Sequence, residues 1–65
     1  MRIGQVVKLR DAFGNELLRR IVAWDETNVY VCRDDEFVDA TAEVREPLCI
    51  GFNRKYVLGV VNEGS

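Results

Sequence analysis

Histidine is absent from this chain of 65 residues, which contains only two cysteines and one proline. Without histidine, the chain lacks the usual general base near neutral pH and the usual member of a catalytic triad. The cysteines, Cys32 and Cys49, lie far apart in the sequence, whereas zinc sites generally use four ligands that come as close pairs. We therefore expect no metal and no cofactor.

Sequence motifs that mark catalytic sites are also missing. The chain contains no glycine-rich phosphate loop, no nucleophile elbow and no Cys-x-x-Cys pair. The adjacent acids Asp34, Asp35 and Glu36 are a candidate for carboxylate chemistry, which needs two carboxyl groups facing each other across a cleft. Neighbouring acids at the end of a strand are more typical of a solvent-exposed cap. The sequence therefore predicts that the chain is not an enzyme.

Long apolar runs are lacking too. The first residues contain no apolar segment of a signal peptide, and no run approaches the ~20 residues of a transmembrane helix. These features predict a cytoplasmic protein without a membrane partner. Nothing in the sequence indicates export, so Cys32 and Cys49 are expected to be reduced thiols in the core. The alternative is a disulfide between them, which requires that their strands be neighbours.

Acidic and basic residues are nearly equal in number but unevenly distributed. Nine Lys or Arg and eleven Asp or Glu residues give a formal net charge of −2, which argues against a general binder of polyanions. Residues 1–24 hold five basic and two acidic residues, whereas residues 25–46 hold two basic and eight acidic ones. We therefore expect a basic face and an acidic edge.

Five short segments have the pattern of β-strands, namely residues 3–10, 16–24, 29–33, 48–52 and 55–61. Turn-forming residues separate them at residues 11–15, at residues 25–28 and at Asn53-Arg54. Residues 34–46 are the least clear segment. A short helical turn around residues 39–44 and a long hairpin loop are the alternatives there.

These segments predict an all-β fold in which residues 1–65 form a single domain. The expected architecture is a five-stranded antiparallel SH3-like small barrel, with the strands in chain order. The predicted core consists of Ile3, Val7, Leu9, Ile21, Val29, Val31, Leu48, Ile50, Tyr56 and Leu58. Apolar residues are also expected on outward faces, at Val6, Leu18, Val22 and Val57. That surplus suits an alternative in which a bent sheet is completed by a second copy.

The aromatic residues have two alternative roles. Trp24 and Phe52 are expected in the core, because so small a chain needs its largest side chains buried. Tyr30 or Tyr56 is a candidate for a surface platform on which nucleic acid bases stack.

The basic residues are the main candidates for a binding surface. Lys8, Arg10, Arg19 and Arg20 lie on the first two strands, and Arg54 and Lys55 lie at the last turn. One interpretation is a small patch for phosphate or for an acidic partner. The other is a solvated face with cross-strand ion pairs to Glu16 and to the acidic segment.

Two runs resemble the Sm-like small barrel, which is part of the wider SH3-like group. Residues 21–31, Ile-Val-Ala-Trp-Asp-Glu-Thr-Asn-Val-Tyr-Val, read as an apolar strand, an acidic turn and an asparagine that leads into an apolar strand. Residues 49–53, Cys-Ile-Gly-Phe-Asn, hold a central glycine. The resemblance covers about residues 4–61 and implies a ring-forming RNA binder, with Asn28 and the residues around Gly51 facing the RNA. The Arg-Gly of the family's second motif is Ile50-Gly51 here.

Taken together, these features predict a non-catalytic interaction module that acts through its surface on a protein partner or on a second copy of itself. The alternative is an Sm-like protein that binds RNA or single-stranded DNA, which the net charge disfavours. The candidate binding residues are Lys8, Arg10, Arg19, Arg20, Asn28, Tyr30, Arg54 and Lys55.

Overall fold

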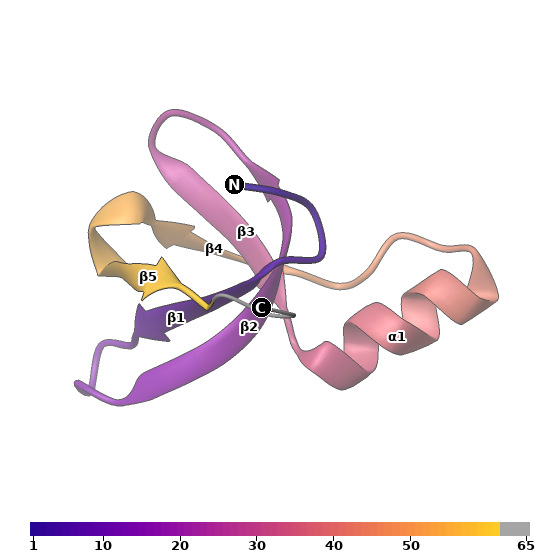
Figure 1. The fold of residues 1–65 in the computed structure, drawn as a ribbon, viewed down its shortest axis with the longest axis horizontal. Coiled ribbons are helices and arrows are strands. Elements are labelled where there is room, and N and C mark those ends of the chain that lie inside the picture. Colours follow the sequence, from indigo (N-terminus) through magenta and orange to yellow (C-terminus); the bar gives the residue numbers. More distant parts are fainter. Residues whose placement is uncertain (62–65) are drawn as a thin grey trace.

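The strands of this protein form one five-stranded antiparallel sheet with the order β4-β3-β2-β1-β5 (Figure 1). The structure is a computed structural model, and it describes residues 1–61. The elements are β1 (Val6–Arg10), β2 (Glu16–Trp24), β3 (Asn28–Cys32), α1 (Asp34–Glu43), β4 (Ile50–Asn53), the 3₁₀ helix η1 (Arg54–Tyr56) and β5 (Val57–Val60). The predicted predominance of β-structure is confirmed, and the second strand has the predicted bounds.

The hairpin between β1 and β2 follows from the chemistry of its loop. The Asp11 carboxylate accepts hydrogen bonds from the backbone amides of Phe13 and Asn15, both at 2.9 Å. Gly14 adopts a φ of 84°, a conformation that glycine reaches without steric cost. The loop predicted at residues 11–15 is therefore confirmed, and it aligns β1 with β2 from Arg10 opposite Glu16 onwards.

The last strand departs from the predicted order. β5 pairs with β1, at the edge of the sheet opposite β4, so the prediction of strands in chain order is wrong here. η1 connects β4 to β5, and the Asn53 side chain caps it by accepting a hydrogen bond from the Lys55 amide at 3.0 Å. η1 is a single turn that carries the chain across to β1. Within residues 1–61, the two edge strands β4 and β5 do not pair with each other, so the sheet does not close into a barrel.

Residues 34–43 form a helix of ten residues, longer than the short helical turn expected and in place of the hairpin loop. Asp34, Asp35 and Glu36 occupy its first turn, where negative charge interacts favourably with the helix dipole. These three acids, which the sequence suggests lie exposed at the end of a strand, are thus the start of α1. No helix in residues 1–61 has the length and apolar character needed to cross a membrane.

α1 lies to one side of the sheet (Figure 1). Its Phe37 contacts Gly4, in the segment before β1. The Phe37 ring carbon Cζ lies 3.2 Å from the point that a Cβ on Gly4 would occupy, so this glycine allows the ring to approach the backbone. The Arg20 guanidinium lies 6.0 Å from the centroid of the same ring. It also donates hydrogen bonds to Asp34 Oδ1 at 2.6 Å and to the Gly4 carbonyl oxygen at 2.7 Å. Arg20 therefore ties the start of α1 to β2 and to the segment before β1.

Five fully buried side chains form the core cluster of the sheet, and all five were predicted to lie in the core: Val7, Leu9, Ile21, Val29 and Val31. Cys32 and Ala40 are buried as well. The pairing of β2 with β1 and with β3 places the core cluster on one face of the sheet. Phe52 packs against this cluster as expected, and so does Val57, for which the sequence predicted an outward position.

Five other predicted core residues are exposed: Ile3 by 68%, Leu48 by 80%, Ile50 by 67%, Tyr56 by 40% and Leu58 by 44%. Trp24 is also exposed, by 39%, against the prediction that it lies in the core. Both cysteines are free thiols, as expected, but Cys49 is exposed and only Cys32 is buried. These residues are uncovered because the open sheet has no second layer over its edges among the described elements.

The end of α1 places a valine where glycine is usual. Val44 has φ 54° and ψ 49°, its amide donates to the Thr41 carbonyl oxygen at 3.3 Å, and the Arg45 amide donates to that of Ala40 at 3.0 Å. This is a Schellman motif, whose left-handed residue is generally glycine because a Cβ is disfavoured there. Val44 is 92% exposed, so no burial of its side chain offsets this strain.

The Val44→Gly substitution is therefore expected to stabilise the protein. Removing the strained β-branched side chain should raise the free energy of unfolding by about 1 kcal/mol. The greater entropy of glycine in the unfolded chain offsets part of this gain. The matched control is Val38→Gly, which removes an exposed valine from within α1 and should destabilise the protein by a few tenths of a kcal/mol. Urea unfolding of both variants checks the prediction, and a lower midpoint for Val44→Gly would contradict it.

Candidate functional site

A groove of about 460 Å³ runs between the open side of the sheet and α1. We call it the β4–α1 groove. Its apolar lining comes from β2, β3, β4 and the segment before β4, namely Leu17, Val31, Leu48, Ile50 and Phe52. This volume lies within the range of about 300–1,000 Å³ typical of ligand pockets. The groove therefore combines an apolar floor with enough space for side chains of a partner.

The rim of the β4–α1 groove carries both signs of charge. Arg19 and Arg33 contribute guanidinium groups, and Asp35 and Asp39 contribute carboxylates from α1. Arg33 Nε lies 3.5 Å from Asp35 Oδ1, in an ion pair whose two side chains are largely exposed. Such a surface pair contributes little to stability. Its charges are therefore available to a partner that approaches the groove.

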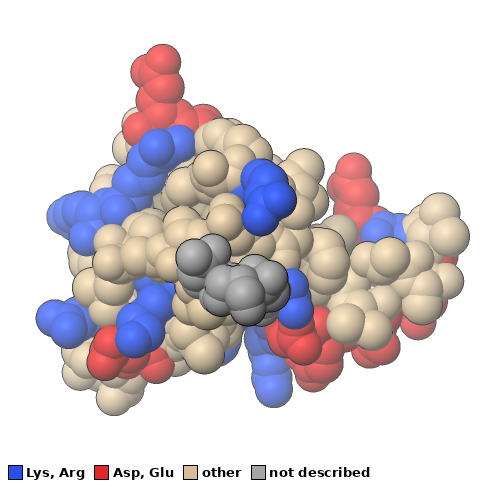
Figure 2. Space-filling view, viewed as in Figure 1, with Lys and Arg blue, Asp and Glu red and all other residues tan. Residues whose placement is uncertain are grey.

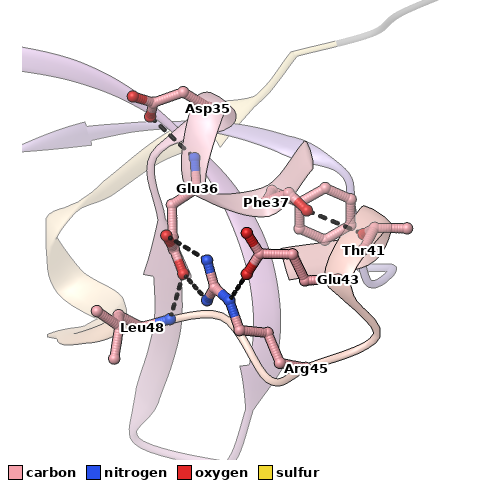
Figure 3. A network of polar contacts seen from close by, with 7 residues as sticks. All are labelled: Asp35, Glu36, Phe37, Thr41, Glu43, Arg45 and Leu48. Carbon is pink, nitrogen blue, oxygen red and sulfur yellow. Dashed lines mark hydrogen bonds and ion pairs between the residues drawn. The ribbon is translucent and has the colours of Figure 1, made fainter. Parts of the chain in front are cut away.

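A polar network holds the wall of the groove that follows α1 (Figure 3). The Glu36 carboxylate accepts hydrogen bonds from Arg45 Nη1 at 2.6 Å and from the Leu48 amide at 2.9 Å. Arg45 Nε also donates to Glu43 Oε2 at 2.5 Å, so its guanidinium lies between two carboxylates. This network fastens the returning chain to the first turn of α1 and places Leu48 beside the groove.

These contacts change the ionisation of both partners. The hydrogen bond from Arg45, together with that from the Leu48 amide, lowers the pKa of Glu36 from 4.5 to about 2. The hydrogen bonds to Glu36 and Glu43 raise the pKa of Arg45 above its ordinary value. Both groups are therefore charged at neutral pH.

The structure does not gather the predicted basic residues of β1 and β2 into one patch. Lys8, Arg10 and Arg20 lie on the face opposite the core, whereas Arg19 pairs with the buried Val7 and so lies on the core face. Lys8 Nζ lies 3.6 Å from Glu16 Oε1. On the face shown in Figure 2, Lys and Arg side chains form separate groups, several of them beside Asp or Glu. Arg19 is the member of this set that reaches the β4–α1 groove.

Three other predicted binding residues do come together, around Asp25. The Asp25 carboxylate accepts hydrogen bonds from the Asn28 amide at 2.7 Å and from the Tyr30 hydroxyl at 3.2 Å. Arg54 Nε donates to the Asp25 carbonyl oxygen at 2.8 Å. The hydrogen bonds from the Asn28 and Thr27 amides lower the pKa of Asp25. We call Asp25, Asn28, Tyr30 and Arg54 the turn cluster, and its centre is a carboxylate.

The last of the predicted binding residues, Lys55, lies next to the turn cluster in the chain. Its Nζ is 5.2 Å from the centroid of the Tyr56 ring, within reach of a cation–π contact. The charge of Asp25 raises the pKa of Tyr30, whose hydroxyl is therefore a hydrogen-bond donor at neutral pH. Of the two tyrosines expected as candidates for a stacking platform, Tyr30 is thus held by its hydroxyl to a carboxylate, and Tyr56 is exposed by 40%.

Sequence reasoning missed the apolar lining of the groove. The sequence predicts Leu48 and Ile50 in the core, because alternating apolar residues do not reveal whether another element covers them. No signal in the sequence would have separated them from the buried valines. Within residues 1–61, no three His, Cys, Asp or Glu side chains lie close enough to hold a metal ion.

The low pKa of Glu36 predicts how the stability of the protein depends on pH. The folded-state pKa is about 2 and the unfolded-state value is near 4.5, so this carboxylate stabilises the folded state fully above pH 4.5. That stabilisation is lost as the pH falls from about 4.5 to about 2. The Glu36→Gln variant is therefore expected to lose less stability than the parent protein between pH 5 and pH 2.5, measured as urea midpoints. Glu46→Gln, which changes an exposed acid nearby, is the control, and its urea midpoints should depend on pH as those of the parent do. Equal dependence of the urea midpoint on pH in all three proteins would contradict the prediction.

Comparison of the chain with protein-family models, with curated proteins and with solved structures finds no match in any of the three. The resemblance to Sm-like domains therefore stays a prediction from the sequence.

Proposed function

We propose that this chain is a non-catalytic interaction module that binds a second copy of itself through the β4–α1 groove. The observation that carries the proposal is the exposure of apolar side chains beside that groove, 80% for Leu48 and 67% for Ile50. Contiguous apolar surface of this kind generally marks an interaction site. The absence of histidine and of catalytic motifs from the sequence supports the non-catalytic part.

The small size of the core supports association. Only five side chains form the buried cluster of the described residues, which is little for a domain that must offset the entropy of ordering its chain. Domains below ~70–80 residues generally need a disulfide, a metal or a partner subunit in addition to their core. A second copy laid over Leu48 and Ile50 supplies the missing apolar layer.

The charges around the groove favour a second copy over an unrelated partner. In a two-fold symmetric dimer the same patch contacts itself, so it must be complementary to itself. The rim of the β4–α1 groove meets this requirement, because Arg19 and Arg33 can face Asp35 and Asp39 of the other copy. A patch with one sign of charge would repel its own copy.

The fold itself supports a finer assignment within this proposal. The strand order β4-β3-β2-β1-β5 and the 3₁₀ turn between β4 and β5 are compatible with an SH3-like small barrel that is left open between its edge strands. An edge strand presents unpaired backbone groups, which invite pairing with another chain. Association at β4 would cover that edge together with Ile50.

Nucleic acid binding is the second candidate, favoured by the gathering of Asn28, Tyr30 and Arg54. The Asp25 carboxylate at the centre of this turn cluster opposes it, since a negative charge repels phosphate. We therefore expect no retention of RNA or single-stranded DNA oligonucleotides in a filter-binding assay at ~50 mM salt, where phosphate affinity is strong. Retention that is lost in Arg54→Gln would favour the nucleic acid candidate instead.

Self-association is tested by sedimentation equilibrium over a wide concentration range. The parent chain is expected to form a dimer, and Ile50→Asp should raise its dissociation constant at least ~10-fold, because it places a charge in the apolar interface. Val38→Asp is the matched control: Val38 is 57% exposed on α1 and does not line the groove. Circular dichroism establishes that both variants fold. A parent chain that stays monomeric at millimolar concentration, or equal weakening by both variants, would overturn the proposal.

A further inference from the structure

The two cysteines flank the end of the ladder that pairs β3 with β4. The register of this antiparallel pair runs Asn28 opposite Asn53, Val29 opposite Phe52, Tyr30 opposite Gly51 and Val31 opposite Ile50. If this register continues by one step beyond the ladder, Cys32, the last residue of β3, is opposite Cys49, the residue immediately before β4. The thiols are far apart in the sequence, and the pairing of their neighbours Val31 and Ile50 places both cysteines at the same end of the ladder.

Residues in this relation have the spacing that a disulfide needs. Directly opposed residues of an antiparallel pair have Cα atoms about 4.5–5.5 Å apart and side chains on the same face. A disulfide spans Cα distances of about 4.4–6.8 Å. Both cysteines line the β4–α1 groove, and the Cys49 thiol contributes to the electrostatic environment of Cys32.

We propose that Cys32 and Cys49 are an oxidation site, at which a disulfide oxidant such as oxidised glutathione converts the two free thiols into a cross-strand disulfide in the wall of the groove. The bridge closes a loop that contains the whole of α1 and pins the segment before β4 to the end of β3. The proposal concerns a single chain and does not depend on self-association.

The two thiols differ in accessibility, and this sets the order of the steps. Cys49 is exposed, whereas Cys32 is buried, and burial raises the pKa of the Cys32 thiol. Because the thiolate is the nucleophile, Cys49 reacts first with the external disulfide. Its sulfur forms a mixed disulfide with one glutathionyl group, and the glutathione thiolate that leaves takes up the proton lost by Cys49.

Cys32 completes the reaction from within the fold. Its thiol loses a proton and attacks the Cys49 sulfur, which breaks the mixed disulfide and releases the second glutathione. In total, two protein thiols are oxidised to one disulfide, and one oxidised glutathione is reduced to two glutathione thiols. No other oxidant is needed, and reduced glutathione in excess reverses both steps.

The experiment measures the equilibrium of the wild-type chain in glutathione redox buffers, once under native conditions and once in denaturing urea, at a dilute concentration. If the fold holds the thiols in place, the equilibrium constant for the intramolecular disulfide should be about 10²-fold larger in the native state, as expected for closing a loop of this length. The product should have lost the mass of two hydrogen atoms. A native-to-urea ratio of one or below would overturn the proposal.

Two variants separate the roles of the thiols. Cys32→Ala should end as a mixed disulfide on Cys49, whereas Cys49→Ala should react far more slowly, since its remaining thiol is buried. A wild-type product that keeps its glutathionyl group, or that joins two chains through Cys49, would also overturn the proposal. The assay is run at a concentration at which sedimentation detects only monomer. Failure of the proposed self-association therefore leaves the result unchanged, and the reverse also holds.

Discussion

The register of β2 against its two neighbours is the constraint on which the rest of this structure depends. Val7 lies opposite Arg19 on one side, and Ile21 lies opposite Val31 on the other, so β2 joins two sets of buried valines and leucines on a single face. A slip by one residue would turn Lys8 and Arg10 toward that face and expose Val7. The Asp11 loop fixes the register from one end, because its carboxylate holds the backbone of the turn.

The same topology leaves apolar surface uncovered. β4 continues the sheet beyond β3, and its Phe52 still reaches the core, whereas Ile50 lies past the buried cluster. η1 then carries the chain to β1, so no strand of the described residues lies beside the outer edge of β4. The β4–α1 groove and the position of both cysteines in its wall are consequences of this edge. The surface proposed for association and the proposed oxidation site therefore share one origin in the strand order.

The sequence predicts those parts of the structure that depend on local pattern. The bounds of β2, the Asp11–Asn15 loop and the five buried core residues all follow from alternation and turn chemistry. It does not predict the parts that depend on distant partners. For α1 the sequence offers only a short helical turn around residues 39–44 as an alternative. The first turn of the helix consists of acids whose partners, such as Arg20 and Arg45, are known only once the chain is folded. Leu48 and Ile50 were misplaced for a related reason, since burial requires a covering element that no local pattern reveals.

The sheet and the helix are held by different kinds of interaction, and the groove lies where they meet. The sheet depends on apolar packing and on backbone ladders, whereas α1 is attached to β2 by the ion pair of Arg20 with Asp34 and by the contact of Arg20 with the Phe37 ring. Ala40 is the buried residue of α1. Polar contacts at the surface are weaker than a packed core and respond to pH and salt. Elements held in this way generally open at a lower free energy than the core does. The wall formed by α1 and the following segment is therefore the part of the groove that opens most easily. A partner can move this wall, and a bond between the two cysteines can fix it, without disturbing the sheet.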